Sequence, residues 1–104
     1  MSQQSKNGRQ PHLYILKYEH DHPGCYKVGR TCDYGNRLKI LNSGHLANLM
    51  YVAKYDDLGH LELLVHDELA PFRLNCASRE WFEVSVEHID RTIRTIHGVV
   101  DWLM

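Results

Sequence analysis

The sequence has little of what marks a secreted or a membrane protein. Its three cysteines, Cys25, Cys32 and Cys76, are an odd number with no CxxC pair, which favours reduced thiols over a disulfide framework. No apolar run approaches the roughly 20 residues of a membrane helix, and the polar N-terminus lacks the apolar stretch of a signal peptide. We therefore expect an intracellular protein, in the cytoplasm or the nucleus, that makes no contact with a membrane.

Internal repeats and low-complexity segments are also absent, and 104 residues are a usual length for one domain. With 43% hydrophobic and 24% charged residues, the chain is able to bury a core without disulfides or a structural metal. Residues 1–10 are polar and are predicted to form a flexible arm. Residues 11–104 are predicted to form the single folded domain.

The net charge of −1 conceals a difference between the two halves of the chain. Residues 1–54 carry eight basic and three acidic side chains, whereas residues 55–104 carry four basic and ten acidic ones. Such a division is typical of a protein that presents one face to a polyanion and holds structural or metal-binding carboxylates elsewhere. Charge alone equally allows two solvated faces of opposite sign.

The pattern of apolar residues predicts a small α/β fold. β-branched and aromatic runs predict short strands at 12–18, 25–30, 49–55 and 80–84. Helical spacing predicts helices over 34–42, from 58 to a point before Pro71, and from 86 onward. We expect a small sandwich in which a central, mainly antiparallel sheet of three to four short strands is flanked by three helices.

Polar residues lie where each predicted helix begins. Asp33, Asp57 and Ser85 are suited to accept hydrogen bonds from the first free N–H groups of these helices. Gly98 is a point at which the last helix frays or ends. Glu62 falls inside the apolar stripe of the second helix, and a buried carboxylate is costly unless it is paired. Glu62 is therefore expected at the solvent-exposed edge of the stripe, in an ion pair, or facing a cleft.

Eight histidines raise the question of a metal site, but no set of histidines and cysteines has the spacing of a zinc site. A phosphate-binding glycine loop, a nucleophile elbow and an HExxH motif are absent as well. The preferred interpretation is that the histidines are scattered over the surface and do not form a metal site.

Several short segments, taken in order, resemble the GIY-YIG nuclease family, in particular its compact branch from phages, large DNA viruses and some cellular genes. They are residues 13–16, 26–31, 33–38, 61–62 and 79–82. The resemblance extends from His12 to about Ile93. Two departures are that His12 and Leu13 replace the family's glycine and isoleucine, and that the loop between the first two segments is longer. The resemblance implies a viral protein acting in a host cell, or a cellular relative.

The resemblance assigns roles to four residues. Tyr14 would position or deprotonate the attacking water, and the second role requires a pKa well below the usual value of roughly 10. Lys27 would lower that pKa or hold the water itself. Arg37 would clamp the scissile phosphate with its planar guanidinium group. Glu62 would be the single protein ligand of Mg²⁺ or Mn²⁺.

Three further residues are expected to contact the substrate. Gly29 would let the backbone approach the phosphate closely. Arg30 would contact a flanking phosphate, and Asn75 would correspond to a family asparagine.

Two other side chains have open roles. His66, one helical turn beyond Glu62, is either a solvated side chain or a proton-transfer group. Glu80 is expected to pack, or to pair with Arg79 or with an active-site base.

The preferred function is therefore a metal-dependent endonuclease that hydrolyses phosphodiester bonds in DNA. Specificity would come from a second copy of the chain or from an accessory protein. The alternative is a module on a nuclease-like fold that binds DNA or protein without cutting it. Arg37 and Glu62 together favour the enzyme, because a binder has no use for a carboxylate facing phosphate. A purely structural protein that self-associates through its last helix is the least favoured class.

Overall fold

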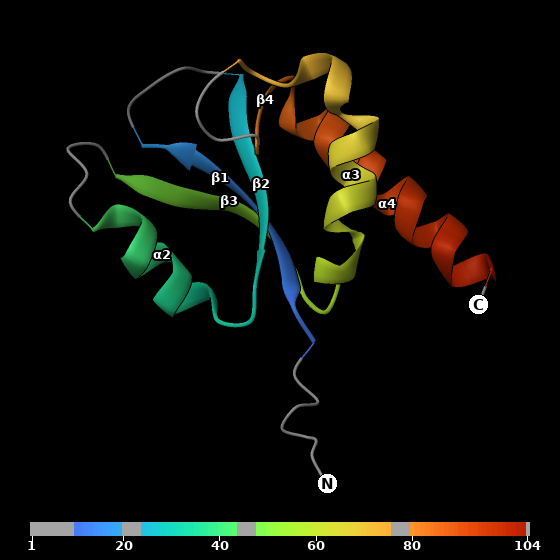
Figure 1. Ribbon diagram of the computed structural model, residues 1–104, viewed down its shortest axis with the longest axis horizontal. Helices are drawn as coiled ribbons and strands as arrows, with labels where there is room; N and C mark the ends of the chain where they lie inside the picture. Colours follow the sequence, from blue (N-terminus) through green and yellow to red (C-terminus); the bar gives the residue numbers. More distant parts are fainter. Residues whose placement is uncertain (1–9, 20–23, 44–47, 76–79, 104) are drawn as a thin grey trace, which may run out of the picture.

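The computed structural model describes residues 10–19, 24–43, 48–75 and 80–103 of the 104 (Figure 1). The strands are β1 (His12–Tyr18), β2 (Cys25–Thr31), β3 (Leu49–Tyr55) and β4 (Trp81–Glu83). The α-helices are α2 (Tyr34–Asn42), α3 (Glu62–Glu68) and α4 (Val86–Leu103), and the short 3-10 helices are η1 (Gly59–Leu61) and η2 (Ala70–Phe72). The predicted arm lies almost wholly outside the described residues, so the division at residue 10 stays a prediction.

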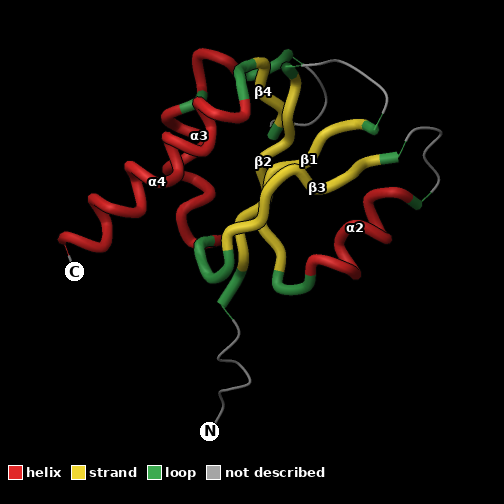
Figure 2. The backbone as a smooth tube through the Cα atoms, turned by 180° about the vertical axis from the view of Figure 1, so that it is seen from behind, coloured by secondary structure: helices red, strands yellow, loops and turns green. Residues whose placement is uncertain are grey.

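The four strands form one sheet in the order β3-β1-β2-β4, and every neighbouring pair is antiparallel. This confirms the predicted α/β fold. Figure 1 and the reverse view in Figure 2 show α2 on one side of the sheet, and α3 and α4 together on the other. Among the described residues, no helix is both long and apolar enough to cross a bilayer.

The core lies between the sheet and the pair of helices α3 and α4. Successive side chains of a strand point to opposite faces, and Leu13 and Ile15 of β1 are fully buried against this helix pair. The same cluster takes in Val28, Leu61, Val65, Leu69, Phe82, Ile89 and Ile93. Each such side chain contributes roughly 1.5–3 kcal/mol on burial. Tyr14 and Leu16 point to the other face and are also fully buried.

The first helix begins and ends as the sequence predicts. Asp33 has an extended backbone, and its carboxylate accepts a hydrogen bond from the N–H of Asn36 at 3.1 Å. The helix runs from Tyr34 to Asn42, although none of its residues is fully buried. Ser85 also acts as predicted, because its hydroxyl accepts from the N–H of His88 at 3.1 Å.

Two predictions about helix ends are wrong. Asp57 does not cap the second helix: its φ is 64°, and its N–H donates to Nδ1 of His12 at 2.9 Å. The chain instead enters α3 through the 3-10 turn Gly59–Leu61. Gly98 does not end the last helix, which continues to Leu103. Ile96 and Val100 pack against the core on either side of it, and this packing outweighs the low helix propensity of glycine.

The predicted loop after α3 also contains more structure than expected. Residues 70–72 form the 3-10 helix η2, and Arg73 makes an isolated antiparallel bridge with Phe82. This bridge, together with the pairing of β2 with β4, brings the start of β4 back to the sheet. As a result, Glu80 lies beside residues of β2.

Candidate active site

The hydroxyl of Tyr14 and the guanidinium group of Arg37 meet on the α2 side of the sheet. Tyr14 comes from the central strand β1, and Arg37 comes from the first turn of α2, where its N–H donates to the Asp33 carbonyl at 3.0 Å. Nε of Arg37 donates to the Tyr14 hydroxyl at 3.4 Å. Two of the four residues assigned by resemblance, 23 positions apart, are therefore in contact.

Gly29 gives the Tyr14 hydroxyl the space that it occupies. The two residues are paired across β1 and β2. A Cβ atom added at Gly29 would lie 2.6 Å from Cζ of Tyr14 and 2.9 Å from Oε1 of Glu80, and it would overlap the tyrosine hydroxyl. Any side chain here would displace the phenol or the carboxylate, so glycine is required by this close approach.

The pKa of Tyr14 is raised, which is opposite to the lowering that a tyrosine base requires. Burial is the main cause, and the negative charges of Glu80 and Glu62 add to it, whereas Arg37 lowers the pKa through its hydrogen bond and its charge. The cation that acts on the phenol is thus Arg37. Lys27 is not among the causes of this shift, and its role toward Tyr14 stays a prediction.

Lys27 is instead held by Glu80. Its side chain is almost completely buried on β2, and Nζ lies 3.1 Å from Oε1 of Glu80, which is one-third exposed. A buried ammonium group requires such a partner. Glu80 also raises the pKa of Arg37 and of Tyr14. The sequence left the role of Glu80 open. The structure places Glu80 beside Gly29, Lys27 and Tyr14.

Glu62 is the first residue of α3, and its carboxylate forms an ion pair with Arg30 of β2. Oε1 of Glu62 lies 3.5 Å from Nε of Arg30, and the glutamate side chain is 14% exposed. Of the three expected settings, the ion pair is the one observed. Arg30 points to this carboxylate, and its own side chain remains 57% exposed at the rim of the site.

The donor set is suited to a hard divalent cation with a largely aqueous shell. Among the residues that the structure describes, no group of three or more histidine, cysteine, aspartate or glutamate side chains forms a metal-binding cluster. Glu62 alone would supply one carboxylate, and Mg²⁺ is commonly held by one or two carboxylates together with waters and substrate phosphate. The residues present therefore fit such an ion.

Two of the weaker candidates form no hydrogen bond with Tyr14 or Arg37 among the residues that the structure describes. Asn75 is exposed in the segment before β4, and within the described ranges no hydrogen bond joins it to Tyr14 or Arg37. His66 is not a solvated side chain. Its Nε2 lies 2.8 Å from the carbonyl oxygen of Val28, and its ring packs against Phe82. It therefore ties α3 to β2 at the residue preceding Gly29.

Tyr51 is a site neighbour that the motif comparison did not reveal. Its ring packs edge-on against Tyr14 at 5.5 Å, and its hydroxyl donates to the carbonyl of Tyr34 at 2.7 Å. Burial raises the pKa of Tyr51 to about 12. Alternation in the predicted strand 49–55 is the signal that places Tyr51 on one face of the sheet. Tyr51 thereby links the phenol of Tyr14 to the start of α2.

Comparison with known proteins gives one result. A search of curated proteins and a search of solved structures found no match. The family model described as the T5orf172 domain matches residues 11–97, which include Tyr14, Lys27, Arg37, Glu62 and Glu80. The match spans all the strands and most of α4. The chain belongs to the T5orf172 domain family.

Proposed function

We propose that this protein is a metal-dependent endonuclease that hydrolyses phosphodiester bonds in DNA. The observation that carries the proposal is the contact between Arg37 and Tyr14, with the carboxylates of Glu62 and Glu80 close enough to shift the pKa of the phenol. Membership of the T5orf172 domain family supports a nuclease or DNA-binding role. The resemblance of the sequence to GIY-YIG nucleases supports the finer assignment.

Arg37 is the group that would bind the scissile phosphate. Its contact with the neutral phenol is long, at 3.4 Å, whereas charge-assisted bonds from arginine to phosphate are shorter and frequently paired. Arginine also retains its charge at any pH that a protein tolerates. The guanidinium group would therefore stabilise the negative charge that develops on the phosphate oxygens during attack.

Tyr14 would position the attacking water rather than deprotonate it. Because its pKa is raised, the phenol is protonated at neutral pH, so it is able to donate one hydrogen bond and accept another. Glu62 would hold the divalent ion, which would make bound water more acidic and stabilise negative charge on the phosphate. Lys27, fixed by Glu80, would add a second positive charge beside Arg37. These residues orient the water and the phosphate for in-line attack.

A binding module that does not cut DNA is the second candidate. The ion pair between Arg30 and Glu62 favours it, because this pair partly satisfies the carboxylate without a metal. The overall charge does not distinguish the two functions, since the net charge of −1 provides little general attraction to DNA. Cleavage assays separate them directly.

The test is incubation of supercoiled plasmid with the full chain in Mg²⁺, in Mn²⁺ and in EDTA. We expect nicking with either metal and none in EDTA. Glu62→Gln and Arg37→Ala should each reduce nicking by about 10²-fold or more, whereas Glu68→Gln on the same helix α3 and Arg94→Ala on α4 should retain it. Circular dichroism spectra should show that all four variants are folded.

Duplex, single-stranded and branched DNA of the same sequence should be compared in the same assay. Unchanged nicking in both Glu62→Gln and Arg37→Ala would contradict the proposed site. Metal-independent DNA binding by the wild-type chain, without cleavage of any of the three substrates, would establish the binding module instead.

A further inference from the structure

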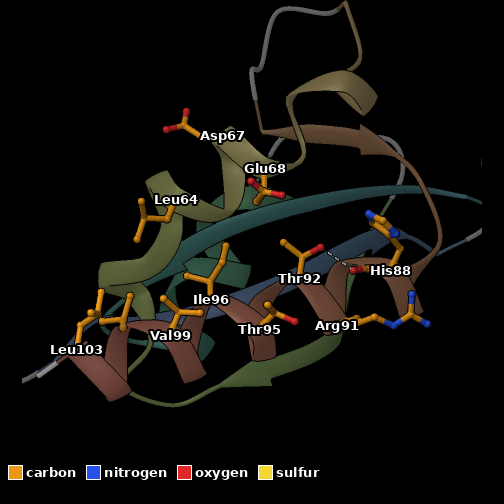
Figure 3. A pocket seen from close by; sticks show the side chains of 11 residues that line it. Leu64, Asp67, Glu68, His88, Arg91, Thr92, Thr95, Ile96, Val99 and Leu103 are labelled. Atoms are coloured by element: carbon orange, nitrogen blue, oxygen red, sulfur yellow. Dashed lines mark hydrogen bonds between the residues drawn. The ribbon is translucent and has the colours of Figure 1, made fainter.

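An open groove between α3 and α4 leaves large apolar side chains in contact with water. Figure 3 shows Leu64 of α3 opposite Ile96, Val99 and Leu103 of α4. Leu64 is 47% exposed, Val99 is 53% exposed and Leu103 is 69% exposed. The groove has a volume of about 660 Å³. These exposed apolar side chains gather in one groove, which is the arrangement expected of an interaction site.

The two ends of the groove differ in chemistry. Leu64, Val99 and Leu103 form the apolar end, whereas the other end carries charges of both signs, from Asp67 and Glu68 of α3 and from Arg91 of α4 (Figure 3). Trp102 precedes the lining residue Leu103 on α4 and is 82% exposed, although it does not itself line the groove. Its ring combines a large apolar surface with an N–H donor. A partner for Trp102 should therefore offer apolar contact, a cation for the ring face and an acceptor for the N–H.

The charged end of the same groove offers this combination. Arg91 provides a guanidinium group that stacks well on an indole ring, and Asp67 and Glu68 provide acceptors. Within one chain Trp102 is unable to reach that end, because Trp102 and Arg91 are 11 residues apart on one helix, or about 16 Å at 1.5 Å per residue. The α4 helix of a second copy, packed antiparallel, would bring its Trp102 to this end.

We propose that this groove is the interface of a two-fold symmetric homodimer, in which Trp102 of each copy packs against Arg91 of the other. A two-fold interface requires a surface that is complementary to itself, and one chain carries both the exposed Trp102 next to Leu103 and the charged end of the groove at Arg91. Thr95 lies about midway between Arg91 and Trp102 and lines the groove, so it would lie near the symmetry axis. A buried tryptophan paired with an arginine is typical of an interface hot spot.

The dimer would leave the candidate active site open. The lining residues of the groove include none of Tyr14, Lys27, Arg37 and Glu62, and Arg37 lies on α2, on the other side of the sheet (Figure 2). Two sites in one assembly would suit cleavage of both strands of a duplex. The interface itself does not depend on the proposed nuclease activity.

Sedimentation equilibrium of the full chain, without DNA or metal, tests the proposal. We expect a mass twice the 12.2 kDa of the monomer. Val99→Asp should weaken association at least tenfold, whereas Ile40→Asp should not, although Ile40 on α2 is similarly exposed at 56%. Trp102→Ala and Arg91→Glu should each weaken it as well. A wild-type chain that is monomeric, or that forms open-ended polymers, would overturn the proposal, as would an unchanged dimer in Val99→Asp.

Cross-linking tests the orientation independently. In a parent with serine at positions 25, 32 and 76, Thr95→Cys should form a disulfide-linked dimer on mild oxidation, whereas Asp101→Cys, which does not line the groove, should not. Equal cross-linking of both variants would exclude the two-fold arrangement. A dimer that fails to nick DNA would contradict the proposed function alone, and a monomer that nicks DNA would contradict the dimer alone.

Discussion

Nε of Arg37 donates a hydrogen bond to the Tyr14 hydroxyl over 3.4 Å, and each group changes the pKa of the other. The arginine lowers the pKa of the phenol against the larger effect of burial, and the phenol raises the pKa of the guanidinium group. This contact joins the most buried strand of the sheet to a helix that has no fully buried residue.

Arg37→Ala should raise the pKa of Tyr14 further, because the substitution removes the cation that stabilises the phenolate. Titration of the tyrosine ring carbons by NMR would measure this shift. Nicking should fall by about 10²–10³-fold, the usual cost of losing one group that stabilises transition-state charge. Arg37→Lys should preserve part of the shift in pKa but little of the activity, because lysine lacks the planar fork. A Tyr14 pKa that stays constant in Arg37→Ala would contradict the contact.

Gly29→Ala should destabilise the fold by about 1–3 kcal/mol, since the added methyl group overlaps the Tyr14 hydroxyl and crowds Glu80. Gly98→Ala is the matched control. Nothing lies within 4 Å of the Cβ position at Gly98, which is in the interior of α4. That variant should be more stable than the wild type by about 0.5–1 kcal/mol. Urea denaturation of both variants gives the comparison, and equal effects would refute the close approach.

Glu80→Gln should destabilise the protein by about 1–3 kcal/mol, because it leaves the buried ammonium group of Lys27 without its charged partner. Lys27→Met combined with Glu80→Gln should recover part of that loss. A double-mutant cycle from urea denaturation should then give a coupling energy of about 1–2 kcal/mol. Strictly additive effects would show that the ion pair contributes no coupling.

Asp90 and Tyr55 should make stability depend on pH at both extremes. The Tyr55 hydroxyl donates to Asp90 at 2.6 Å, and this bond and Arg94 hold the pKa of Asp90 below its ordinary value. The resulting stability is present above the unfolded pKa of about 3.9 and is lost as pH falls through the folded pKa. Asp90→Asn and Tyr55→Phe should each flatten the acid limb of a plot of thermal midpoint against pH.

At the alkaline end of the same profile, stability changes with pH in the opposite direction. Burial and the hydrogen bond to Asp90 raise the pKa of Tyr55. Stability from this group is therefore complete below the unfolded pKa of about 10 and is lost as pH rises from there through the folded pKa. Tyr55→Phe should remove this alkaline loss. An unchanged profile at both extremes would show that the pair contributes nothing.

The strands and the first helix were predictable because their signals are local. Alternating β-branched and aromatic residues determine β1 and β3, and Asp33 caps α2 by a bond within three residues. The prediction that Asp57 caps the second helix failed because His12, a side chain distant in sequence, accepts a hydrogen bond from the N–H of Asp57. The prediction that the last helix frays or ends at Gly98 failed because packing by Ile96 and Val100 outweighs propensity. Both errors arise where tertiary contacts override a local preference.

Motif order proposed the members of the candidate site, but it did not indicate which of them are paired. Motif order identified Tyr14, Arg37 and Glu62, and the structure brings the first two into contact. The partner of Lys27 depends on the register of β2 with β4, where Lys27 lies opposite Trp81, next to Glu80. No local pattern encodes the pairing of residues that lie more than 50 positions apart in the sequence, as Lys27 and Trp81 do. The raised pKa of Tyr14 likewise follows from burial, which only the folded chain shows.

The absence of any fully buried residue from α2 has a consequence for how the proposed activity would be lost. Hydrogen exchange should find the amides of β1, which is paired on both edges, among the slowest in the domain, and those of α2 much faster. Arg37 would then leave its place during brief openings that keep the sheet intact. Mild heating or a low concentration of denaturant would therefore abolish the proposed nuclease activity well before the sheet unfolds. The activity would return immediately on cooling.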